Sequence, residues 1–196
     1  AKPAPSVIDG QEEAPTEEEF SANPYTAVRP EVPAAAQQRF TKALVFFGQG
    51  DLSAAEQGFS ALTQDYPSLS GPWLNLGLVY QQSERAELAP AQFEAAIRAN
   101  KLNINAYNQL AISLREQGKF LEAEKQYLAA LAVWPDHSPS HRNLGILYDL
   151  YMGREADALQ HYQRAWQLDP EPTLRIWMLD LKRRVSKEPK GERQTQ

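Results

Sequence analysis

Small residues recur along the chain at a fixed interval, and apolar residues keep the same interval around them. Ala43, Gly77, Ala111 and Gly145 each lie 34 positions after the one before. Beside them, apolar and aromatic residues are spaced by three and four positions, which is typical of one face of a helix. The pattern predicts an array of similar helical units, because self-similarity at such a period marks repeat architectures.

The second unit has the clearest signature. It contains Trp73, Leu76, Gly77 and Tyr80, then Ala89, Phe93 and Ala96. This order is W-x2-L-G-x2-Y followed by A-x3-F, so the chain resembles the tetratricopeptide repeat family. The third and fourth units keep the frame, through Tyr107, Leu110, Ala111, Leu114, Ala123, Tyr127, Ala130 and Pro135, and through Leu144, Gly145, Tyr148, Ala158, Tyr162, Ala165 and Pro170. The first unit is weaker, because Arg39 and Lys42 replace the expected Trp and Leu.

The resemblance implies an all-α fold, a right-handed superhelical α-solenoid of four helix pairs. We place the pairs at residues 36–69, 70–103, 104–137 and 138–172, so the repeats span 36–172. Small residues are needed where the two antiparallel helices of a pair approach closely, and aromatic side chains fill the space beside them. Pro67, Pro135 and Pro170 follow second helices, where a missing N–H ends one unit and starts the next.

The segments outside the repeats differ in composition. Residues 1–35 carry seven acidic residues against two basic ones and include six prolines. Such a segment buries too little surface to offset the entropy of ordering, so we expect a disordered acidic tail. A helical stripe predicts a capping helix over 173–186, and residues 187–196 are expected to be a disordered basic tail. The stripe is Leu174, Trp177, Met178, Leu181 and Val185, and the expected polar outer face is Arg175, Lys182, Arg183 and Arg184.

Composition argues against several classes of function. The 196 residues include no cysteine and carry a net charge of −5, which excludes thiolate chemistry and disfavours nucleic acid as a partner. The sequence contains no phosphate loop, nucleophile elbow or paired-carboxylate motif. Pro139 separates His137 from His141, so we do not expect them to share a helical face as metal ligands would, and His161 is expected to face outward. We therefore predict no enzyme activity, catalytic residue, metal, cofactor or small-molecule substrate.

The cellular compartment stays open at this level. No apolar run approaches the length needed to cross a membrane. The lack of cysteine fits the cytosol or the periplasm, and a chain that starts at Ala1 is either processed or trimmed. A removed signal peptide or lipid anchor would suit the tail that follows, which favours a periplasmic or outer-membrane-associated location over a cytoplasmic one. Membrane contact would then run through such an anchor or through a partner.

The resemblance also implies a binding surface. In this family the first helix of each pair lines a concave groove, and its sixth position points inward. Those positions are Thr41, Asn75, Gln109 and Asn143, and a ladder of carboxamides can pair with the backbone of an extended peptide. Neighbouring positions add Phe40, Leu44, Leu74, Leu78, Asn105, Asn108, Ile112, Arg142 and Ile146. Two alternatives stay open: the amides are solvated or cap helices, and several of the apolar residues are buried between repeats.

The function implied is a non-enzymatic scaffold that binds a peptide or helix of another protein in this groove. Small proteins of the family often serve assembly machineries in bacterial envelopes, so the expected setting is the assembly of a larger envelope complex. A clamp for the C-terminal carboxylate of chaperone partners is not expected, because Asn75 is the one residue of that clamp present here. The alternative is a self-associating structural subunit or an adaptor occluded by its own tail.

Overall fold

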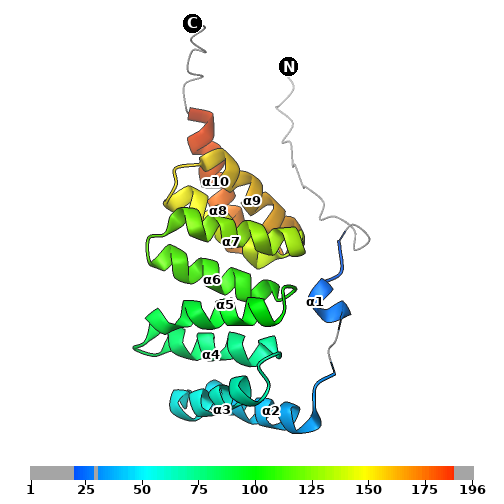
Figure 1. Ribbon diagram of the computed structural model, residues 1–196. Helices are drawn as coiled ribbons and strands as arrows, with labels where there is room; N and C mark the ends of the chain where they lie inside the picture. The colour runs from blue at the N-terminus through cyan, green and yellow to red at the C-terminus, as the bar shows by residue number, and fades with distance from the viewer. Residues whose placement is uncertain (1–19, 29–30, 188–196) are drawn as a thin grey trace, which may run out of the picture.

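The structure is an array of helices that pack in the order of the chain (Figure 1). The computed structural model describes residues 20–28 and 31–187, and over these residues it contains no strand. The helices are α1 (Pro24–Ala27), α2 (Ala34–Gly48), α3 (Leu52–Asp65), α4 (Ser70–Gln82), the 3-10 helix η2 (Ala86–Leu88), α5 (Ala89–Ala99), α6 (Ile104–Glu116), α7 (Phe120–Val133), α8 (Ser138–Leu150), α9 (Glu155–Leu168) and α10 (Pro172–Lys187). Helices α2 to α9 pack in consecutive pairs, each stacked on the next. The predicted all-α solenoid is confirmed.

Glycines in the left-handed region close three of the turns within pairs. Gly50, Gly118 and Gly153 have φ values of 78°, 74° and 63°, and each lies between a first helix and its second. Glycine adopts these angles without the penalty that a Cβ would bring. The chain between α4 and α5 contains no glycine, and there the 3-10 helix η2 makes the connection.

Two of the small residues at the 34-residue spacing lie where a first helix meets an aromatic ring of its partner. A Cβ on Gly77 would lie 2.4 Å from the ring of Phe93, and one on Gly145 would lie 2.5 Å from the ring of Tyr162. Both rings are fully buried on second helices. At these two positions the ring occupies the space that a side chain would need. This explains why the helices of a pair require a small residue there.

The apolar core continues along the whole solenoid. One cluster of buried residues includes Phe59 and Val79 in the first units. A second cluster extends from Ala89 to Leu181 in the capping helix. Tyr80 packs against both clusters, so no gap separates them. Each unit thereby buries a face that it could not bury alone.

Helix α10 caps the last pair. Leu174, Met178 and Leu181 of the predicted stripe are buried, whereas Trp177 is 36% exposed, with its ring centre 5.4 Å from that of Tyr162. Arg184, expected on the outer face, instead forms ion pairs with Asp149 at 2.5 Å and Glu155 at 2.8 Å. The reason is that Asp149 on α8 and Glu155 on α9 both lie within reach of the long arginine side chain.

A short N-terminal segment lies against the repeats. We name residues 20–28, which include α1, the edge strap. It runs along the side of the solenoid that holds the turns from the second helix of one pair to the first helix of the next (Figure 1). We call this side the turn edge. This placement differs from the disordered tail expected over residues 1–35, of which 1–19 and 29–30 lie outside the described residues. Likewise, residues 188–196 of the expected basic tail lie outside them.

Candidate protein-binding surfaces

The predicted groove residues all lie on the first helices α2, α4, α6 and α8. Four of them repeat at 34 residues, one on each first helix, and we name them the apolar row: Leu44, Leu78, Ile112 and Ile146. Leu44 is 38% exposed, and the other three are half-buried with one side packed on the core. The apolar row therefore presents partly accessible hydrophobic groups at a regular spacing along the solenoid.

The three predicted carboxamides have different environments. Asn75 donates from Nδ2 to the carbonyl oxygen of Gly71 in its own helix, at 2.9 Å. Asn143 is buried and donates from Nδ2 to Oδ1 of Asn108, at 3.2 Å. The half-buried side chain of Gln109 makes no hydrogen bond within the described residues. One amide of the three is thus left for an external partner, while the other two bond within the fold.

Asn108 belongs to a buried network that joins α6 to α8. Its Oδ1 accepts from Oγ of Ser140 at 3.3 Å as well as from Asn143. Because the Ser140 hydroxyl donates there, Nδ1 of His137 donates to Ser140 Oγ, at 2.7 Å. All four side chains are buried, so this network stabilises the stacking of two units.

Three other predicted residues have separate surroundings. Leu74 is half-buried and packs against the core. Arg142 pairs with Glu171 at 2.7 Å, so its charge is already compensated. Asn105 is exposed and lies at the turn edge, where it lines a small pocket with Tyr25 of the edge strap. The structure therefore does not gather all predicted residues into one site.

Two histidines form a pair between α8 and α9. Nε2 of His141 donates to the carbonyl oxygen of Pro135 at 2.8 Å, so its Nδ1 accepts from Nδ1 of His161, at 2.9 Å. The expectation that His161 faces outward is wrong, because its ring is half-buried against His141. Burial lowers the pKa of His161 and of His137 to about 4, and it also lowers the pKa of His141. These rings are therefore neutral at physiological pH.

The start of the edge strap is bound by three residues of the solenoid that were not predicted from the sequence as site residues. Asp136 Oδ2 accepts from both the backbone N and the Oγ of Ser21, each at 2.6 Å. The indole Nε1 of Trp134 donates to the carbonyl oxygen of Ser21, at 2.8 Å. Arg164 bonds the other oxygen of Asp136 and lies 5.7 Å from the ring centre of Phe20. We name Trp134, Asp136 and Arg164 the edge clamp.

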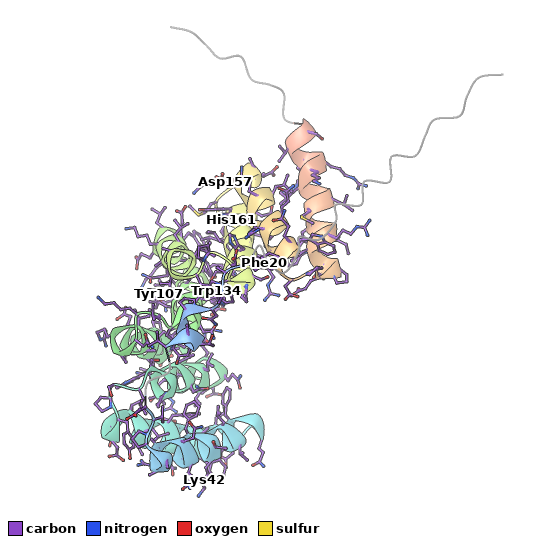
Figure 2. All side chains as sticks on the ribbon, turned by 90° about the vertical axis from the view of Figure 1, so that its right-hand side faces the viewer. Phe20, Lys42, Tyr107, Trp134, Asp157 and His161 are labelled. Atoms are coloured by element: carbon purple, nitrogen blue, oxygen red, sulfur yellow. The ribbon has the colours of Figure 1, made fainter. Side chains whose placement is uncertain are left out.

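The electrostatics of the clamp depend on the strap. Burial alone would raise the pKa of Asp136, but the hydrogen bonds from Ser21 and Arg164 hold it below its usual value. Asp136 is 8% exposed, so its carboxylate needs these partners. Figure 2 faces the turn edge and shows α1 in front of the solenoid, with Phe20 and Trp134 near its upper end.

The lower end of the strap borders a pocket of about 320 Å³. Its walls are largely apolar and include Tyr25 and Val28 of the strap, with Phe40 and Leu69 of the first units. Phe40 also packs edge-on against Phe59, with ring centres 5.6 Å apart. Phe40 is thus partly a core residue and partly a wall of this pocket, away from the apolar row.

One signal in the sequence could have indicated the edge strap. Phe20 and Tyr25 are aromatic residues in a segment that is otherwise acidic and rich in proline. Aromatic groups dominate the energetics of interfaces, so their presence in such a tail is informative. The clamp itself carries no comparable signal, because Asp136 and Arg164 are separated in sequence and resemble ordinary surface charges.

The fold and these surfaces define a repeat protein of the class that binds other proteins. Matches to the tetratricopeptide repeat family cover residues 40–104 and 102–171. The chain belongs to this family. Its fold is accordingly that of a protein–protein interaction scaffold.

Several known proteins are similar to this chain. The type IV pilus assembly protein PilF of Pseudomonas aeruginosa is 24% identical over 141 residues, which are 70% of this chain and 56% of PilF. A solved structure of P. aeruginosa PilF superposes with a TM-score of 0.70 at 22% identity, over 78% of this chain and 69% of that one. The human protein O-mannosyl-transferase TMTC2 is 30% identical over 99 residues, 49% of this chain and 12% of TMTC2.

A further solved structure is YrrB, described as a tetratricopeptide repeat protein with an unusual peptide-binding site. It superposes with a TM-score of 0.61 at 23% identity, over 76% of this chain and 75% of YrrB. The chain spans about half the length of PilF and a small part of TMTC2. Likeness at these identities establishes the fold.

Two further findings concern the described residues. Over residues 20–28 and 31–187, no helix is long and apolar enough to cross a membrane. In the same part of the chain, no group of three or more histidine or acidic side chains is placed to hold a metal ion.

Proposed function

We propose that this chain is a non-catalytic scaffold that binds an extended or helical segment of a partner protein along its first helices. The observation that carries the proposal is the apolar row, which offers one partly accessible aliphatic group per unit beside the amide of Gln109. Apolar groups beside an amide suit a peptide, because the apolar groups contact its side chains while the amide pairs with its backbone.

The wider setting of this proposal is the assembly of a larger complex in a bacterial envelope. Similarity to PilF supports this setting, since that protein is a pilus assembly protein. The proposed location is periplasmic or outer-membrane-associated. Fractionation of cells that express the natural protein tests the location, and recovery in the cytosol alone would contradict it.

Site-specific photocrosslinking tests the binding surface. A photoreactive residue at Leu44 or Gln109 is expected to crosslink to one recurring partner segment in cells. The matched control is Leu128 on the second helix α7, which is 45% exposed compared with 38% for Leu44. Equal crosslinking from Leu128 and Leu44 would show that the first helices are not the binding surface.

A further inference from the structure

We propose that the edge clamp is a second peptide-binding site and that the edge strap is its ligand, bound in cis. The site lies on the turn edge and does not depend on the surface proposed along the first helices. The ligand that it fits is a short segment with an aromatic residue, a serine directly after it and, in a helical turn that follows, a tyrosine four positions after the serine. In this chain those residues are Phe20, Ser21 and Tyr25.

The clamp recognises backbone as well as side chain. Asp136 accepts from the N–H of Ser21 and Trp134 donates to the C=O of Ser21, so the solenoid pairs both backbone polar groups of this residue. The hydroxyl of Ser21 adds a third bond to the same carboxylate. Peptide-binding sites gain affinity from hydrogen bonds to the backbone of the bound segment. The bond to the serine hydroxyl adds selectivity for the side chain.

Aromatic residues fix the two ends of the ligand. The ring of Phe20 lies near the guanidinium of Arg164, a cation–π arrangement. The hydroxyl of Tyr25 lies 3.2 Å from Oγ of Ser70, which also accepts from Nδ2 of Asn103 at 3.2 Å. The strap therefore contacts the solenoid at the turn before α8 and again at the start of α4, with specific groups at each place.

The strap is bound to the solenoid without being part of its core. None of residues 20–28 is buried, and both core clusters consist of residues from α2 to α10. Release of the strap thus leaves the core of the repeats intact. The edge site can therefore open and accept another segment of the same pattern.

The connection between strap and solenoid favours occupation in cis. Five residues, 29–33, join Val28 to the start of α2. A link this short gives an effective concentration on the order of millimolar, far above that of a second copy in solution. The ligand bound at rest is accordingly the chain's own strap.

Peptide binding to the full chain tests the proposal. The probe is a fluorescent synthetic peptide of residues 18–28, and the strap-released variant carries Ser21→Pro with Tyr25→Ala. Proline removes the N–H that Asp136 accepts, and alanine removes the contact with Ser70. The peptide is expected to bind the released variant at least about tenfold more tightly than the unaltered chain, whose site is occupied. Equal affinities, or binding to neither chain, would overturn the proposal.

A pair of tryptophan variants, each made in the released chain, tests the site itself. Trp134→Phe is expected to weaken the peptide about three- to tenfold, because it removes one hydrogen bond. Trp73→Phe is the matched control, since its indole donates to Pro67 within the repeats, at 3.0 Å. Equal losses in both variants would contradict the assigned site. Sedimentation of the unaltered chain as a dimer that Ser21→Pro dissociates would overturn the cis assignment.

Discussion

Gly145 has no room for a side chain, because the ring of Tyr162 occupies the position of its Cβ. Gly145→Ala is therefore expected to lower the free energy of unfolding by about 1–3 kcal/mol, the cost of overpacking a close contact. Gly48 is the matched control. It ends α2 with no atom within 4 Å of its Cβ position, so Gly48→Ala is expected to be neutral or to stabilise by up to about 1 kcal/mol. Urea denaturation measures both, and equal effects would contradict this explanation of the small residues.

The buried histidines make the stability of the fold depend on pH. His137 has a pKa of about 4 in the folded state, compared with 6.5 for an ordinary histidine, so the unfolded chain binds more protons between these values. Its contribution to stability is complete above pH 6.5 and is lost as the pH falls towards 4. His161 contributes in the same direction over the same range.

His137→Asn tests this contribution. Asparagine can keep the bond to Ser140 and does not titrate, so the stability of the variant is expected to decline less between pH 6.5 and pH 4, by at most about half, because His161 and His141 also have lowered pKa values. Urea denaturation at several pH values measures it. An unchanged slope would show that His137 does not carry a depressed pKa in the folded chain.

Among the elements, the capping helix α10 separates buried from exposed leucines. Leu181 is 0% exposed, whereas Leu179, two positions earlier, is 51% exposed. Leu181→Ala is expected to destabilise by about 2–4 kcal/mol, through lost burial and the cavity that remains. Leu179→Ala should cost less than about 0.5 kcal/mol, as surface substitutions do. Thermal unfolding compares them, and similar losses would mean that α10 does not cap α9 as described.

The helices that keep the 34-residue period and the capping helix α10, which has its own apolar stripe, could be predicted from the sequence, whereas the edge strap and the ion pairs of Arg184 could not. The 34-residue spacing was informative because a small residue is needed beside a buried ring, as at Gly77 beside Phe93 and at Gly145 beside Tyr162. Arg184 lies outside the repeats, so the period does not predict its contacts. Its partners Asp149 and Glu155 belong to other helices. The three carboxamides were periodic too, but their hydrogen bonds depend on neighbours that do not follow the period. Asn143 donates to Asn108 within the fold, and its position in the repeat did not predict this bond.

At the scale of the whole molecule, the two candidate surfaces lie on different sides of one solenoid. The apolar row follows the first helices, and the edge strap crosses the turns that connect successive units. A ligand along the first helices and a ligand on the turn edge would each contact several units at once. In a repeat protein, whose contacts are otherwise between neighbours, such a ligand links units that do not touch each other and restrains them where it binds.

The edge strap is therefore expected to restrain the turns that it crosses and to leave the opposite edge unaffected. The backbone amides of Leu69, Asn103 and His137 each donate within a turn of the strap side. In Ser21→Pro these amides should exchange with solvent about three- to tenfold faster, because local opening no longer requires the strap to move. The amides of Gly50 and Gly118, which donate within turns of the other edge, serve as the control and should keep their rates. Hydrogen-exchange NMR resolves both sets. Equal acceleration at both edges would indicate general destabilisation, and unchanged rates on the strap side would show that the strap does not restrain the solenoid.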